Sequence, residues 1–257
     1  MSITSPIAIP IAVPINLGIS EAIGGAVVPA WQPSDLFQSG EAGGWYDPSD
    51  LSTLWQDAAG TTPVTADGDP VGKMEDKSGN GNHMTQSVLA ERPTYKTAGG
   101  LHYLDLTTNA VGMDYTFTPP ATLTQSLGYD TNADGAGLFF AMKSTTTKYG
   151  GAFESGSSQT VAGVVYLMTS LYVDSSLHTG TTWGDVYTDV NGKKVMVWEY
   201  TTDAIANTLN FGNWSSANAV YSLDGHLYAH VLSEGSLSTG NRGEMETYIA
   251  GKTGVTL

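Results

Sequence analysis

Short runs in which apolar and polar residues alternate predict that most of this chain folds into β-strands. Residues 101–107 and 113–118 alternate in this way, as strands with one buried face do. Residues 138–142 and 161–173 are more uniformly apolar, which is typical of strands buried on both faces. Residues 226–232 form the last clear run. Turn residues separate these runs, and the spacing predicts a β-sandwich of about nine to twelve short strands.

A short helix is predicted near residue 50. Pro48 would lie in its first turn, and Leu51, Leu54 and Trp55 have the spacing of one helical face. Gly60 limits its length.

A second helix is predicted to close the chain. Asn241 can cap its start, and Glu244 lies three residues further on, as in a capping box. Gly251 is expected to end it. Its predicted buried stripe comprises Met245, Tyr248 and Ile249.

Residues 1–30 differ in composition from the rest of the chain. Ile, Ala and Val dominate, Lys and Arg are absent, and prolines recur every four residues at Pro6, Pro10 and Pro14. This spacing of prolines prevents a continuous helix, so no membrane insertion is expected, and the basic start of a secretory signal is missing. We expect an extended arm that docks on a partner or on sister subunits, with a disordered tail as the alternative.

The remaining chain is predicted to be a polar, Gly-rich hinge over residues 31–44 and a single domain over residues 45–257. The 257 residues include no cysteine, which excludes disulfides, cysteine-based zinc sites and a cysteine nucleophile. A chain of this length buries a large core without such support. The formal net charge of −15 would repel a phosphate backbone, so nucleic acid is not an expected partner.

The dipeptide Asn191-Gly192 is typical of a two-residue type I′ hairpin loop. The hairpin would place Trp183 opposite Tyr200 and Asp185 opposite Trp198 on one side, with valines on the other side. Aromatic rings beside carboxylates can stack on sugar faces and accept hydrogen bonds from sugar hydroxyls. A subunit interface and a purely structural role stay open as alternatives. The candidate carbohydrate-binding residues are Trp183, Asp185, Tyr187, Trp198 and Tyr200.

Residues 130–135 match the first half of a calcium-binding loop, with oxygen ligands at alternate positions and glycine at the bend. Ala141 stands where such a loop has its acidic twelfth ligand, so a turn rich in Asp and Asn is the alternative. The candidate calcium ligands are Asp130, Asn132 and Asp134. No other cofactor is expected.

Two further patterns bear on chemistry. His226 and His230 lie in the last predicted strand with Tyr228 between them, and we expect these residues on an exposed face of a sheet. The sequence lacks the serine-hydrolase elbow, the Walker loop, the His-Glu-x-x-His motif and the Glu-x-Asp-x-x-Glu run of a jelly-roll glycosidase. We therefore expect that the protein is not an enzyme.

Three stretches together carry a resemblance to a known family. They are Trp45-Tyr46-Asp47-Pro48-Ser49-Asp50-Leu51, then Asp76-Lys77-Ser78-Gly79-Asn80-Gly81-Asn82-His83, and finally the run from Leu237-Ser238 through Glu246-Thr247-Tyr248-Ile249-Ala250 to Gly254-Val255. Over about residues 31–257 the chain resembles the concanavalin A-like, laminin G-like jelly-roll modules of bacteriophage and gene-transfer-agent particle proteins. The resemblance implies an all-β jelly-roll β-sandwich with an extended N-terminal arm and a short C-terminal helix.

The same resemblance implies a structural and adhesive component, such as a spike or fibre, on the surface of a virion or phage-like particle. Such a protein would contact host surface polysaccharide, and residues 1–30 would attach it to other particle proteins. We expect a homo-oligomer, with a trimer as the first expectation. A decoration protein that only stabilises neighbouring coat or tail subunits and a polysaccharide depolymerase stay open as alternatives.

Overall fold

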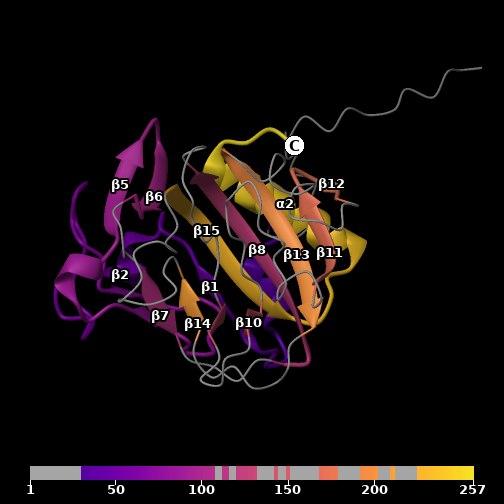
Figure 1. Ribbon diagram of the computed structural model, residues 1–257, viewed down its shortest axis with the longest axis horizontal. Coiled ribbons are helices and arrows are strands. Elements are labelled where there is room, and N and C mark those ends of the chain that lie inside the picture. The colour runs from indigo at the N-terminus through magenta and orange to yellow at the C-terminus, as the bar shows by residue number, and fades with distance from the viewer. Residues whose placement is uncertain are drawn as a thin grey trace, which may run out of the picture. The chain divides into compact units, whose positions relative to one another are not determined.

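A computed structural model gives the structure of the protein. It describes residues 30–107, 112–115, 120–131, 142–143, 149–150, 168–178, 192–201, 209–211 and 225–257. The chain divides into two units, Met1–Ala30 and Trp31–Leu257. The described part of the second unit consists mostly of antiparallel β-sheet with one α-helix at the C-terminus (Figure 1), so the all-β fold class is confirmed.

The described strands form two main sheets, and every pairing among them in these sheets is antiparallel. Sheet A has eight strands, in the order β12 (Ser176–Leu177), β11 (Met168–Val173), β13 (Lys194–Thr201), β8 (Thr122–Thr131), β15 (Gly225–Glu234), β6 (Leu101–Asp105) and β5 (Thr94–Ala98), with β1 (Gly43–Tyr46) also paired to β15. Sheet B has five, in the order β14 (Leu209–Phe211), β7 (Met113–Tyr115), β4 (Met84–Thr85), β3 (Lys73–Met74) and β2 (Leu54–Trp55). A separate pair is β9 (Met142–Lys143) with β10 (Tyr149–Gly150).

The central strands of sheet A are buried on both faces. One face shares a core with sheet B, in which Leu127 and Trp198 of sheet A join Met74 of sheet B. The other face packs against α2 (Thr239–Thr253), where Val195 of β13 and Ile249 of α2 belong to one cluster. Side chains along a strand alternate between faces, so successive residues of the central strands enter two different cores.

The predicted C-terminal helix is confirmed, with shifted boundaries. Ser238 is the N-cap, and its side chain accepts a hydrogen bond from the backbone N–H of Asn241. The helix passes Gly251 and ends at Gly254, whose φ of +75° gives the left-handed C-cap that glycine favours. Met245 and Ile249 are fully buried. Among the described residues, no helix has the length and apolar character needed to cross a membrane.

The predicted helix near residue 50 is wrong. A single 3-10 turn, Leu51–Thr53, leads directly into β2. Leu54 then lies in the core as a strand residue, paired with Met74 of β3, while its carbonyl accepts a hydrogen bond from the N–H of Val64. Apolar residues at this spacing fit one helical face, but pairing on both edges favours the extended chain.

The expectation of a hinge over residues 31–44 is also wrong. Pro33–Leu36 form a 3-10 helix, and Gly43 begins β1, which pairs with β15. Trp31 and Phe37 pack against the cluster between sheet A and α2. The compact unit therefore begins at Trp31. A third 3-10 helix is Leu89–Glu91.

A β-bulge in β15 separates the two histidines. The register between β15 and β8 shifts between Leu227 and Ala229, and such a shift changes which face the following residues occupy. His230 is 0% exposed. Its ring lies 5.6 Å from that of Tyr46 in the core between the sheets, and its Nε2 lies 2.9 Å from Nε2 of Gln125. The expectation of an exposed face is therefore wrong for His230, and Tyr228, which lies between the two histidines, is buried as well.

Burial of His230 has a consequence for stability. Burial lowers the pKa of His230 from 6.5 to about 3. Below about pH 6.5 the unfolded chain therefore binds a proton that the native state does not bind, and stability falls with pH by about 1.4 kcal/mol per unit for this one group. The contribution is complete above pH 6.5 and is lost progressively as the pH falls toward 3.

Between pH 7 and pH 5 we expect the free energy of unfolding to fall by about 2 kcal/mol less in His230→Gln than in the wild type. The measurement is urea unfolding of both proteins at the two pH values, and the difference between proteins cancels the contribution of the carboxylates. An equal pH dependence in His230→Gln and the wild type would contradict this prediction.

Candidate functional site

Strand β13 has partners on both edges, which contradicts the predicted hairpin. Trp198 pairs with Leu171 of β11 on one edge and with Gln125 of β8 on the other. A strand has only two hydrogen-bonding edges, and β11 and β8 occupy both edges of residues 196–200, so neither edge is open for the predicted hairpin. The predicted residues Trp183, Asp185 and Tyr187 lie outside the described residues.

Trp198 does not present its ring to solvent. It is 1% exposed and belongs to the core between the two sheets, so the prediction of an exposed, sugar-stacking ring is wrong at this position. Tyr200 lies two residues further along β13, where its backbone pairs with Leu123 and Met168. The prediction assumed one solvated face, as antiparallel sheets commonly have, whereas α2 and sheet B cover one face of β13 each.

The proposed calcium ligands are described only in part. Asp130 lies near the end of β8 and pairs with His226 of β15, while Asn132 and Asp134 lie outside the described residues. Within the described ranges, no group of three or more His, Asp or Glu side chains could hold a metal ion. Calcium binding by residues 130–134 therefore stays a prediction.

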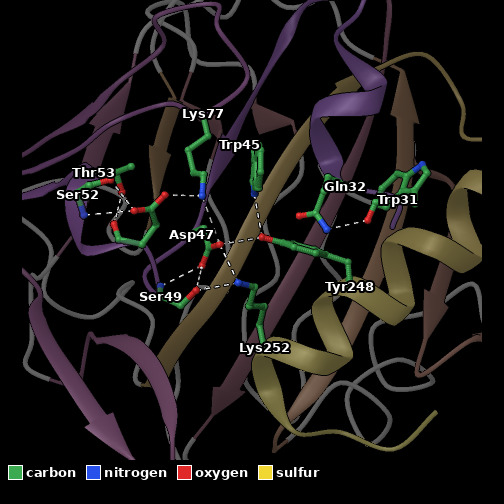
Figure 2. Close-up of polar contacts among 11 residues, drawn as sticks. Trp31, Gln32, Trp45, Asp47, Ser49, Ser52, Thr53, Lys77, Tyr248 and Lys252 are labelled. Atoms are coloured by element: carbon green, nitrogen blue, oxygen red, sulfur yellow. Dashed lines mark hydrogen bonds and ion pairs between the residues drawn. The ribbon is translucent and has the colours of Figure 1, made fainter. Parts of the chain in front are cut away.

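A polar cluster joins β1 to the C-terminal helix, and we call it the clasp (Figure 2). Asp47 is its centre and is 3% exposed. Its Oδ2 accepts hydrogen bonds from the Tyr248 hydroxyl at 2.9 Å and from Lys252 Nζ at 2.8 Å, and its Oδ1 accepts from the Ser49 hydroxyl at 2.6 Å. Lys77 Nζ lies 3.7 Å away and forms a closer ion pair with Asp50, at 2.6 Å. The clasp comprises Trp45, Asp47, Ser49, Asp50, Lys77, Tyr248 and Lys252.

Asp47 of the clasp is ionised, and hydrogen bonds satisfy the polar groups that surround it. Burial alone would raise the pKa of Asp47, but hydrogen bonds from Lys252 and Ser49, with the charges of Lys252 and Lys77, lower it below its usual value. Burial and then the charge of Asp47 raise the pKa of Tyr248 far above its usual value. Tyr248 thus remains a hydroxyl that donates to Asp47 and accepts from Trp45 Nε1 at 3.1 Å. These contacts favour a structural role for the clasp over proton transfer.

The loop of residues 76–83 holds β1 from another side. Oδ1 of the buried Asp76 accepts a hydrogen bond from the Trp45 backbone N–H at 2.9 Å. The Lys77 N–H donates to the Trp45 carbonyl at 2.8 Å, and the Asn82 side chain donates to the Gly43 carbonyl at 2.7 Å. Lys77 Nζ also lies 4.4 Å from the centre of the Trp45 ring. All three sequence stretches that carry the family resemblance therefore meet around β1.

A second cluster lies where four neighbouring strands of sheet A begin or end, and we call it the strand-end patch. The Tyr103 ring centre is 4.4 Å from that of His226 and 5.2 Å from that of Tyr228. Lys193 Nζ lies 4.9 Å from the centre of the Tyr228 ring. Tyr228 is buried, and the other members are partly exposed. The patch comprises Tyr103, Asp105, Asp130, Lys193, His226 and Tyr228.

Two carboxylates flank the imidazole of this patch. In the strand ladder His226 pairs with Asp105 of β6 and with Asp130 of β8, and paired residues project from the same face of a sheet. Burial, followed by the charge of Asp130 and the neighbouring Tyr103, raises the pKa of Tyr228 to about 12. The phenol is therefore neutral at physiological pH. The arrangement offers ring surfaces for stacking together with hydrogen-bond donors and acceptors.

The sequence indicated only part of this patch. His226 and Tyr228 were expected on an exposed face and Asp130 in a loop, but nothing near Tyr103 in the sequence shows that it lies beside them. That neighbourhood depends on the pairing of β6 with β15. Comparison of the chain with protein-family models, with curated proteins and with solved structures finds no match.

Proposed function

We propose that this protein is a structural and adhesive component on the outside of a phage or phage-like particle. In this proposal a jelly-roll β-sandwich contacts host surface polysaccharide, and residues 1–30 attach it, as a homo-oligomer, to other particle proteins. One observation supports the proposal above others. The three stretches that resemble particle jelly-roll modules, far apart in the chain, contact one another in the clasp and in the loop of residues 76–83.

The convergence gives the resemblance a physical basis. Taken singly, each stretch is an ordinary turn or helix end. Together, Asp47 anchors Lys252 of the terminal helix, and Lys77 links the second stretch to Asp50 of the first. Residues that depend on one another across such a distance support a module that folds as one piece. The sheet-on-sheet core with an added helix agrees with the jelly-roll assignment.

The test locates the full-length protein and asks what it contacts. Gold-labelled antibody on purified particles should mark the particle surface, and an excess of free full-length protein should compete with particles for adsorption to host cells. Purified particles that lack the protein would overturn the proposal. Particles that contain it but adsorb equally well against free protein would favour a decoration protein instead.

Removal of residues 1–30 is expected to abolish incorporation into particles without unfolding the rest. The compact unit begins at Trp31, and the removed segment has the apolar, proline-interrupted composition of an attachment arm. The measurement combines the melting temperature of the truncated protein with its copy number in particles. A truncated protein that is still incorporated at the normal copy number would show that attachment lies elsewhere.

A further inference from the structure

We infer that the strand-end patch is the surface through which this protein contacts saccharide, and that it takes neutral hexose units in preference to uronic or sialic acid units. The inference rests on the proposed adhesive function and adds the site and the chemical class of the ligand. The strand-end patch thereby replaces Trp198, which is buried, as the expected place of sugar contact.

The patch has a rigid foundation. Tyr103, His226 and Asp130 belong to three strands that are hydrogen-bonded side by side in sheet A. The rings of Tyr103, His226 and Tyr228 contact one another, so each limits the rotation of its neighbours. A surface whose side chains are held in place before binding loses little conformational freedom when a ligand arrives.

The exposed groups match the chemistry of a neutral sugar. The faces of pyranose rings are rich in C–H groups and stack on tyrosine rings, while their hydroxyls need polar partners around the ring edge. Within the described ranges, no protein group forms a hydrogen bond with the carboxylate of Asp130 or with the hydroxyl of Tyr103. Asp105 differs, because it accepts hydrogen bonds from the N–H and hydroxyl of Thr107 at 2.9 and 2.6 Å. Asp130 is therefore the carboxylate left to accept from a sugar hydroxyl.

Charge disfavours acidic sugars at this place. Asp105 and Asp130 lie on either side of His226, and the one ammonium group of the patch, on Lys193, already lies over the Tyr228 ring. The whole chain adds a formal net charge of −15. Repulsion of a carboxylated sugar acts within a Debye length of about 8 Å at physiological ionic strength, which covers a sugar that touches the patch. A neutral hexose avoids this cost.

The experiment measures binding of the full-length protein to a panel of soluble polysaccharides by affinity electrophoresis. Neutral glucan, mannan and galactan are compared with polygalacturonate, hyaluronan and polysialic acid. Tyr103→Ser and Asp130→Asn should each lower affinity for the bound neutral polymer on the order of tenfold. Tyr172→Ser removes another partly exposed tyrosine of sheet A, which lies under Arg242, and should leave the affinity unchanged. The melting temperature of each variant identifies any loss that results from unfolding.

The outcomes separate the site from the function. Binding by the wild type that both patch variants retain would overturn the assignment of the patch and leave the adhesive function standing. Preference for the acidic polymers would overturn the ligand class. If the wild type binds no polysaccharide and does not compete with particles for host cells, the proposed function fails, and the inference fails with it.

Discussion

Replacing Trp198 with alanine is expected to lower the free energy of unfolding by about 3–5 kcal/mol. The side chain is 1% exposed and fills the core between sheets A and B. Its strand is hydrogen-bonded to β11 on one edge and to β8 on the other, so the backbone cannot move into the space that the indole leaves. The variant therefore bears the cost of a cavity in addition to the lost burial of apolar surface.

A thermal melt measures this effect. For a domain of this size, each kcal/mol shifts the melting temperature by about 2–4 °C, so a fall of roughly 6–20 °C is expected. Trp31→Ala is the matched control, because Trp31 packs only at the margin of the cluster under α2 and is partly exposed. If Trp198→Ala lowers the melting temperature no more than Trp31→Ala does, the indole of Trp198 does not support the core between the sheets.

Local pattern was enough to predict the elements that depend on their own residues. The runs at 101–107 and 113–118 contain β6 and β7, the run at 226–232 lies within β15, and the C-terminal helix forms as expected. In each of these the alternation or the helical spacing agrees with the partners that the fold provides. The start and end of α2 moved because Ser238 and Gly254, at its flanks, form the caps.

The facing of the central strands could not be predicted, because it is decided by segments distant in sequence. α2 covers one face of β13 and sheet B covers the other, so Val195 and Trp198 enter different cores. The bulge between Leu227 and Ala229 then reverses the facing of β15. Neither the covering of β13 on both faces nor the bulge in β15 can be recognised in the sequence of the strand concerned.

Two of the described two-residue hairpin loops have positive φ at both positions, Gly99-Gly100 and Asp174-Ser175, and the second contains no glycine. Asp174 has a φ of +46° and Ser175 a φ of +65°. Non-local contacts hold both residues. The Asp174 carboxylate accepts hydrogen bonds from the Val195 N–H at 2.9 Å and from Lys194 at 2.8 Å, and Ser175 donates to Glu246 of α2 at 2.9 Å. Tertiary contacts offset the local strain here, which is why a search for Asn-Gly or Asp-Gly does not find this turn.

The clasp was predicted in its parts and missed as a whole. Its residues appear in the sequence as a helix start, a polar turn and a helix stripe. The contact of Asp47 with Tyr248 and Lys252 joins residues about 200 positions apart, and such a contact has no local pattern. Lys252 and Lys77 each resemble an ordinary exposed lysine when they are considered separately.

Replacing Asp47 with asparagine is expected to lower the free energy of unfolding by about 2–4 kcal/mol at neutral pH. Loss of one partner from a buried charge network commonly costs about 3–5 kcal/mol, and the lysines here retain some contact with water, with side chains 25% and 20% exposed for Lys252 and Lys77. The asparagine NH₂ would also face donors that need an acceptor. Because the pKa of Asp47 lies below its ordinary value of 3.8, the wild-type advantage should be complete at neutral pH and disappear only as the pH falls below about 4.

Asp50→Asn is the control that separates the buried carboxylate from its lysine. Asp50 forms the closest ion pair with Lys77, at 2.6 Å, but its side chain is 33% exposed, and pairs of this kind contribute about 0–1 kcal/mol. Urea unfolding should therefore show a large loss for Asp47→Asn and a small one for Asp50→Asn. Limited proteolysis should cleave α2 faster in Asp47→Asn, because Tyr248 and Lys252 lose the acceptor that holds the helix against β1. Equal losses in the two variants would show that the clasp depends on the Lys77 ion pair and that Asp47 does not anchor the helix.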